Sequence, residues 1–146
     1  MFLVLSILSN NQGVWLVVKN SQIFLTRNFD IIRGEDKSLL HLQKILDNNG
    51  LKLEDFSGFI LLLKEASLTQ VKIFTTTANT LAWQFDWPIV AEYYFSAKGR
   101  GDNEKILAKV LKKIARLKKF KAITPKYHRQ VDITISKKQA KYKISK

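Results

Sequence analysis

The chain has 146 residues, of which 46% are hydrophobic, enough to build the core of one main domain and too many for a wholly disordered chain. It contains no cysteine, which excludes disulfides, thiolate metal sites and a cysteine nucleophile. The net charge of +13 lies at one end, since residues 1–96 carry 8 Lys/Arg and 9 Asp/Glu, whereas residues 97–146 carry 17 and 3. This asymmetry predicts either a basic arm that meets RNA, DNA or an acidic protein face, or a solvated tail that keeps the protein soluble.

Residues 1–8 are apolar but have neither a basic residue before them nor a small-residue cleavage site after them, so we expect no signal peptide. No stretch approaches the roughly 20 apolar residues that span a bilayer. We therefore expect a cytoplasmic protein that does not enter the membrane.

The first half of the chain has the pattern of an α/β domain. Three apolar runs separated by short polar turns predict an antiparallel meander, at residues 2–7, 14–18 and 23–29. A helix is expected over residues 36–49, ended by Gly50, with one apolar face made of Leu39, Leu42, Ile45 and Leu46. A buried strand at 59–63, a helix at 68–85 and a strand at 89–95 follow. The second helix should bury Val71, Thr75, Ala78, Ala82 and Phe85.

The order strand-strand-strand-helix-strand-helix-strand predicts a mixed five-stranded sheet, because each helical crossover requires parallel neighbouring strands. After residues 1–96, we expect a hinge at 97–101 and a basic amphipathic helix at 102–120, capped by Asp102 or Asn103. A basic tail at 121–146, partly disordered and with a short strand-like run at 131–135, ends the chain.

The sequence offers little that could perform catalysis. Its two histidines, His41 and His128, lack metal-ligating neighbours at helical spacing, and His41 fits a partly buried structural position. No glycine-rich phosphate loop is present, and the six glycines are scattered. We therefore expect no enzyme activity, no cofactor and no metal, and a role in binding other macromolecules.

Several segments occur in the order of a known family. Residues 73–90 read IFTTTANTLAWQFDWPIV, similar to the segment IGLATAKGLALALGIPLV of the TsaB (YeaZ) family, and share Ile73, Thr77, Ala78, Leu81, Ala82, Pro88 and Val90 with it. Residues 67–72, SLTQVK, resemble the family's SFTGLR segment. Residues 36–46 resemble the family's SERLLPAIDELL helix, and residues 51–56 resemble its GLSLKDLD segment. Residues 125–129, PKYHR, resemble the PxYxR near the end of many members.

Two departures from the family pattern stand out. The family's DTS falls at residues 6–8, Ser-Ile-Leu, and its GPG falls at residues 64–66, Lys-Glu-Ala. These positions line the nucleotide cleft in active members of the superfamily, so an ATP site is not expected here. The second lobe is reduced to one helix and a tail.

The resemblance implies a single actin-like (RNase H-like) lobe and a non-catalytic subunit of the bacterial machinery that makes threonylcarbamoyladenosine in tRNA. The implied partners are the catalytic subunit TsaD, bound chiefly through the two helices of the lobe, then TsaE and tRNA. The resemblance leaves open whether the chain forms homodimers without its partner. It also leaves open whether the reduced second lobe weakens TsaD binding.

Helical-wheel positions place three apolar residues off the core-facing stripes, and we predict them as partner anchors: Leu40, Ile73 and Trp83. Coverage by the third helix or by the tail is the alternative. The polar face of that helix predicts nucleic-acid contacts through phosphates. Its residues are Lys105, Lys109, Lys112, Lys113, Arg116 and Lys119. A competing interpretation is a basic RNA- or ribosome-associated protein unrelated to tRNA modification.

Overall fold

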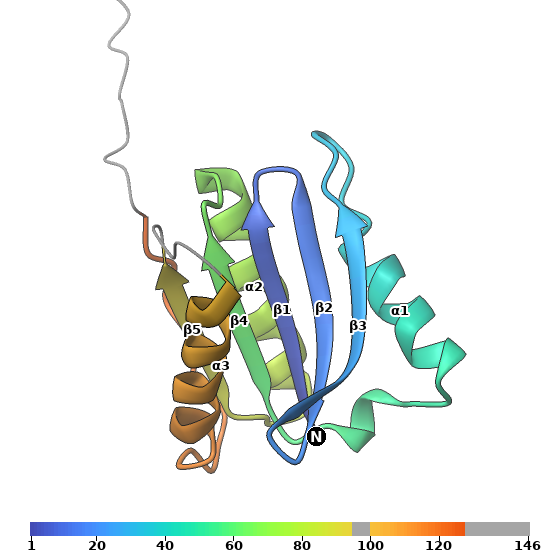
Figure 1. The fold of residues 1–146 in the computed structure, drawn as a ribbon, viewed down its shortest axis with the longest axis vertical. Coiled ribbons are helices and arrows are strands. Elements are labelled where there is room, and N and C mark those ends of the chain that lie inside the picture. Colours follow the sequence, from blue (N-terminus) through green and yellow to red (C-terminus); the bar gives the residue numbers. More distant parts are fainter. Residues whose placement is uncertain (95–99, 128–146) are drawn as a thin grey trace, which may run out of the picture.

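The computed structural model describes residues 1–94 and 100–127, and in it five strands form one mixed sheet in the order β3-β2-β1-β4-β5 (Figure 1). Strands β1 (Phe2–Ser9), β2 (Gln12–Lys19) and β3 (Gln22–Asp30) are the antiparallel meander. Strands β4 (Phe59–Lys64) and β5 (Ile89–Tyr94) run parallel to β1. The predicted fold class, a mixed five-stranded sheet built from the element order strand-strand-strand-helix-strand-helix-strand, is confirmed.

Three helices cover the sheet. Helices α1 (Ser38–Asn48) and α2 (Leu68–Gln84) lie behind it in Figure 1, and α3 (Arg100–Ile114) lies in front of β4 and β5. A short 3-10 turn, η1 (Leu53–Asp55), leads into β4. Among the described residues, none of the helices has the length and apolar character that a membrane span requires.

Successive residues of a strand point to opposite faces, which divides the core in two. One part contacts α1 and α2 and includes Leu3, Leu5, Trp15 and Leu61. The other contacts α3 through Val110, Leu111 and Ile114, and includes Val4, Leu16, Ile60 and Val90. The central strands are therefore apolar on both sides.

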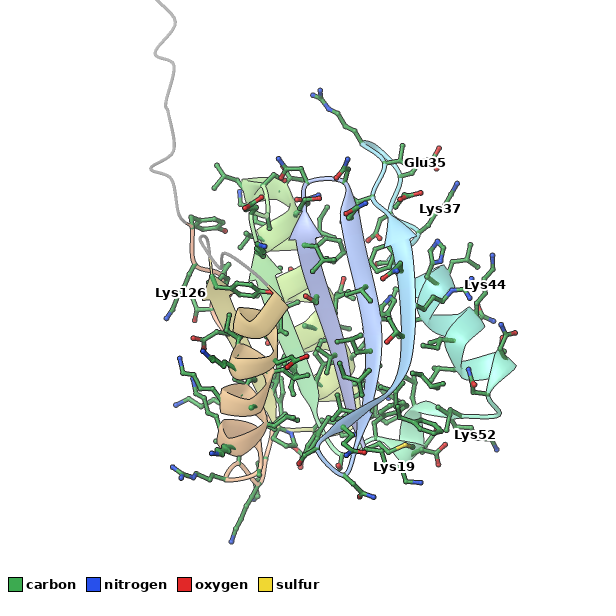
Figure 2. The ribbon with its side chains drawn as sticks, viewed as in Figure 1. Lys19, Glu35, Lys37, Lys44, Lys52 and Lys126 are labelled. Atoms are coloured by element: carbon green, nitrogen blue, oxygen red, sulfur yellow. The ribbon has the colours of Figure 1, made fainter. Side chains whose placement is uncertain are left out.

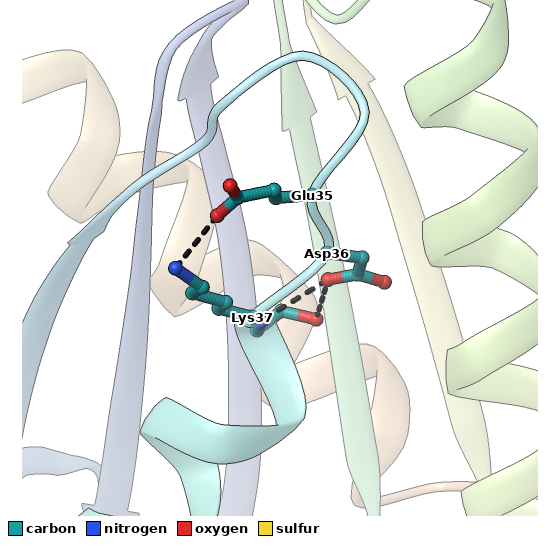
Figure 3. Close-up of polar contacts among 4 residues, drawn as sticks. Glu35, Asp36 and Lys37 are labelled. Carbon is teal, nitrogen blue, oxygen red and sulfur yellow. Dashed lines mark hydrogen bonds and ion pairs between the residues drawn. The ribbon is translucent and has the colours of Figure 1, made fainter.

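Helix α1 starts at Ser38, two residues later than predicted. The Asp36 carboxylate accepts hydrogen bonds from the backbone N–H of Ser38 at 2.9 Å and from its hydroxyl at 2.6 Å (Figure 3). This keeps Asp36 in the preceding loop, where Lys37 also pairs with Glu35 at 2.6 Å. The predicted core face of α1 is wrong at Leu39, which is 49% exposed, whereas Leu42, Ile45 and Leu46 are buried.

Helix α2 follows the prediction more closely. Its N-cap is Ser67, whose side chain accepts from the backbone of Gln70 while the Gln70 side chain accepts from the backbone of Ser67. Val71, Thr75, Ala78 and Ala82 are buried as expected. Phe85 is half-buried and stacks on Trp87 at a ring distance of 4.7 Å, just beyond the end of the helix.

Helix α3 differs from the prediction at both ends. It starts at Arg100, so Arg100 and Gly101 are helical rather than part of a hinge, and the predicted caps, Asp102 and Asn103, lie inside the helix. The rest of the predicted hinge, residues 97–99, lies outside the described residues. The helix ends at Ile114, whose side chain contacts Gly58, the residue before β4. The chain then turns, with the Leu117 N–H donating to the Ile114 carbonyl at 3.0 Å, so the helix ends before its predicted end near Lys119.

After α3 the chain returns along α2 as an extended segment, residues 118–125, which we call the strap. The Phe120 N–H donates to the Asp86 carboxylate at 3.3 Å, and the Asn79 side-chain amide exchanges two 2.9 Å hydrogen bonds with the backbone of Ile123. The Tyr93 hydroxyl donates to the Thr124 carbonyl at 3.0 Å. Phe120 and Ile123 pack against the α1–α2 side of the core. The predicted tail is therefore docked over residues 121–125, whereas its strand-like run at 131–135 lies outside the described residues.

We expect Asn79→Ala to detach the strap, because the substitution removes both hydrogen bonds to Ile123. The free energy of unfolding should fall by about 1–2 kcal/mol, and the Ile123 amide should exchange with solvent much faster. Hydrogen exchange and urea unfolding measure the two effects. Thr76→Ala, at an exposed position one turn earlier in α2, is the control. Unchanged exchange at Ile123 in Asn79→Ala would contradict the role of this amide.

Candidate interaction surface

The described residues contain no cluster of three or more His, Asp or Glu side chains arranged to hold a metal ion. A cavity of about 640 Å³ lies between the loop that precedes α1 and the start of α2. Its walls include Ile32, Arg33, Asp36, Ser67, Gln70 and Ile73. It adjoins the loop after β4, one of the two in which the sequence departs from the family pattern.

Several polar groups of this cavity are already hydrogen-bonded within the protein. Ser67 and Gln70 form the N-cap of α2, and the Gln70 amide also donates to the Asn10 carbonyl at 2.6 Å. Asp36 is held by Ser38. Arg33 is the one cationic side chain among the residues that line the cavity. The hydrogen bonds of Ser67, Gln70 and Asp36 occupy these side chains within the protein.

The three predicted partner anchors are all exposed in the described structure. The exposed fractions are 45% for Leu40, 39% for Ile73 and 66% for Trp83. Neither α3 nor the strap buries these three side chains, and the rest of the predicted tail, residues 128–146, lies outside the described residues. Leu39, which sequence reasoning assigned to the core, adds a second exposed leucine beside Leu40.

The anchors do not form one patch. Ile73 lines the cavity near the start of α2, together with Ile32 of the loop before α1. Trp83 lies ten residues further along α2, about 15 Å at 1.5 Å per residue, and about 80° around the helix. On that side of α2 the strap is attached. Leu39 and Leu40 are thus exposed on α1, Ile73 is exposed beside the cavity on α2, and Trp83 lies on the side of α2 to which the strap is attached.

Helix α1 is held to the sheet by contacts near its first turn. The Trp15 indole N–H donates to the Ser38 carbonyl at 2.8 Å, and His41 stacks on Phe29 at a ring distance of 5.4 Å. Arg27 donates to Nδ1 of His41 at 3.4 Å, a contact in which this nitrogen is the acceptor. Burial first, then the charges of Arg27, Lys44 and Lys37, lower the pKa of His41 below its usual 6.5, against a smaller opposite effect of Asp30. His41 is thus a structural histidine, as predicted.

The six predicted nucleic-acid contacts are all exposed. Lys105, Lys109, Lys112 and Lys113 lie on α3, opposite its buried residues, whereas Arg116 and Lys119 follow the end of the helix. Lys109 pairs with Glu92 of β5 at 2.8 Å, which ties it to the sheet. Three further lysines that were not named individually are exposed on the strap or next to its end: Lys118, Lys121 and Lys126.

No family model and no curated protein matches this chain. Among solved structures, YeaZ from Pseudomonas aeruginosa is similar with a TM-score of 0.54 and 19% identity, over 63% of this chain and 43% of that one. An uncharacterised protein described as similar to peptidase YeaZ from Pseudomonas aeruginosa matches with a TM-score of 0.52 and 18% identity, over 63% and 42%. The chain thus spans less than half the length of either structure. At this identity the likeness shows the fold, and it confirms the expected YeaZ-like lobe.

The lowered pKa of His41 predicts a pH-dependent stability. A group whose pKa is lower in the folded state binds fewer protons there, so stability should be lost as the pH falls below 6.5 and should not change above it. Urea unfolding at pH 7.5 and pH 5.5 should show a larger loss for the wild type than for His41→Phe, which keeps the stacking on Phe29. An equal loss in both proteins would contradict this role of His41.

Proposed function

We propose that this chain is a non-catalytic scaffold subunit that binds a TsaD-like catalytic subunit and supports threonylcarbamoyladenosine modification of tRNA. A TsaE-like subunit is a further candidate partner, and tRNA would contact the basic C-terminal region. The observation that carries the proposal is the exposure of Leu39, Leu40 and Ile73 on the two helices of a YeaZ-like lobe.

Physical chemistry supports docking through these helices. Large apolar side chains on the outer face of surface helices cost free energy when hydrated, and burial in an interface recovers it. Between Ile73 and Trp83 the exposed residues of α2 are Thr76 and Thr80, whose small side chains allow a partner helix to approach closely. Helix α1 contributes Leu39 and Leu40. Trp83 is a further exposed apolar residue of α2, closer to the strap.

The same proposal includes that the chain has no catalytic activity of its own. Ser67, Gln70 and Asn10 beside the cavity bond to one another, and the described residues include no group of three or more histidines and carboxylates that could hold a metal ion. The chain would then act by binding its partner, and its functional residues would be those of the interface.

Co-expression with the TsaD-like subunit of the same genome tests the docking. We expect a 1:1 complex by size-exclusion chromatography with light scattering. Leu40→Asp and Ile73→Asp should each weaken the complex at least tenfold, because each would place a charge in an apolar contact. Leu117→Asp is the matched control, since Leu117 is 42% exposed but lies just after α3, the helix on the other side of the sheet.

No complex in the wild type would overturn the scaffold proposal. A homodimer that the same substitutions at Leu40 and Ile73 dissociate would instead assign these helices to contact between copies of the chain.

A second candidate is a basic RNA- or ribosome-associated binding protein with no role in tRNA modification. The exposed lysines of α3 and the strap favour it, because the described part of this region carries ten Lys/Arg and two Asp/Glu between residues 100 and 127. It predicts tight RNA binding by the isolated chain and no affinity for the TsaD-like subunit.

Both candidates predict that phosphate contacts by this region depend on salt. Charge reversal at Lys109, Lys112 and Arg116 should lower the slope of log affinity for tRNA against log salt by about 1 for each phosphate that is no longer neutralised. Lys44→Glu with Lys52→Glu is the control, because Figure 2 shows these lysines beside α1, away from Lys126 at the end of the strap. Filter binding of tRNA that survives both the triple reversal and deletion of residues 121–146 would exclude a tRNA contact through this region.

A further inference from the structure

Trp83 has an environment unlike that of the other two tryptophans. Trp15 is fully buried and Trp87 is 5% exposed, whereas Trp83 is 66% exposed, more than any other large hydrophobic residue among those described. The Trp83 side chain adds little to the core, because α2 buries a different stripe, which includes Phe74, Ala78 and Ala82. An indole ring held in solvent on a rigid helix offers a flat face for a ligand.

The strap lies beside this indole. Its backbone is fixed to α2 and the turn after it at two points, Asn79 and Asp86, and Trp83 lies between them in the sequence. At about 100° per residue, the Trp83 side chain lies about 40° around α2 from that of Asn79 and one turn along the helix. Trp83 is therefore at the border of α2 and the strap, whose residues come from a part of the chain about 40 positions later.

The strap presents positive charge at this border. Phe120 and Ile123 point into the core, whereas Lys118, Lys119 and Lys121 are exposed. Of the ion pairs in the described part of the chain, neither involves these three lysines. Asp86, the carboxylate to which the strap is bonded, already accepts the Phe120 N–H through one of its oxygens. The lysines are therefore available to an external anion.

We propose that Trp83 and the strap lysines form a binding site for a single strand of nucleic acid, in which an unpaired base stacks on the indole and the neighbouring phosphates contact Lys118, Lys119 and Lys121. An exposed aromatic ring beside a basic track is the arrangement that holds single strands, because stacking recognises any base and the cations follow the backbone. A duplex keeps its bases stacked on each other and offers none to the indole. This site is separate from docking through Leu40 and Ile73 and does not rest on it.

The composition of the site favours nucleic acid over a protein partner. An acidic protein face would satisfy the lysines but would leave the indole against charged groups. An apolar protein face would bury the indole but would leave three ammonium groups desolvated. A stacked base with its flanking phosphates satisfies both kinds of group together.

Tryptophan fluorescence gives a direct test, because only Trp83 of the three indoles is accessible. We would titrate the full chain with a 12-nucleotide single-stranded RNA, with the duplex of the same sequence, and with inorganic polyphosphate. The single strand should quench the emission and the polyphosphate should bind with little quenching. In Trp83→Phe the quenching by RNA should be lost, while Trp15 and Trp87 still emit.

Affinity measurements complete the test. Trp83→Ala should weaken single-strand binding about tenfold, as expected for the loss of one stacked base, and Trp83→Phe should restore part of it. Lys119→Glu with Lys121→Glu should weaken binding at least tenfold, and the control Lys44→Glu with Lys52→Glu less than twofold. All these side chains are exposed, so the thermal midpoints should stay close to that of the wild type.

Equal affinity of Trp83→Ala and wild type for the single strand would overturn the proposal. Equal quenching by polyphosphate would also overturn it, because the indole would then report charge alone. A third outcome is a Trp83→Ala protein that loses the TsaD-like subunit but keeps full RNA affinity, which would assign Trp83 to protein docking and refute the stacking site. If the wild type does not bind the TsaD-like subunit, the fluorescence and RNA-affinity measurements still decide whether the stacking site exists.

Discussion

The burial of β1 and β4 on both faces is the constraint on which the rest of the structure depends. Leu3, Val4 and Leu5 are all fully buried, as are Phe59, Ile60 and Leu61, so consecutive residues need cover on opposite sides of the sheet. Helices α1 and α2 supply it on one side. On the other side only the chain after β5 is available, and α3 takes that place through Val110, Leu111 and Ile114. One amphipathic helix therefore completes the lobe, and its charged residues necessarily face solvent.

The strap arises from the same constraint. Helix α3 ends at Ile114, which lies against Gly58 just before β4, and the chain then packs Phe120 and Ile123 against the α1–α2 side of the core. The amide of Asn79 binds the N–H and the carbonyl of Ile123 together, as a neighbouring strand would, which satisfies a backbone that no sheet pairs. Since Phe120 points inward, Lys119 and Lys121 on either side of it remain exposed. The basic residues near Trp83 are thus positioned by the packing of the apolar ones.

The parts of the fold that could be predicted are those with a strong local pattern. The apolar runs of the strands and the spacing of Leu42, Ile45 and Leu46 identify the elements and their order. Where an element ends is decided by contacts that are distant or specific, such as Asp36 with Ser38, or Ile114 with Gly58. Leu39 lies at the border of the apolar stripe of α1. Periodicity alone does not show whether a residue at that border is buried against the sheet or exposed. The strap depends on a pairing across 44 residues, between Asn79 and Ile123, for which the sequence carries no local signal.

The candidate surfaces were predictable to different degrees for the same reason. Exposure of Leu40, Ile73 and Trp83 follows from the helical wheel, but the wheel of one helix does not show which other segment lies beside it. The strap gives Trp83 a different environment from that of Ile73. Ile73 adjoins an apolar cavity wall, whereas Trp83 adjoins the lysines of the strap. Apolar contacts depend weakly on salt and phosphate contacts depend on it strongly. Binding at the two sides of α2 should therefore respond differently to ionic strength.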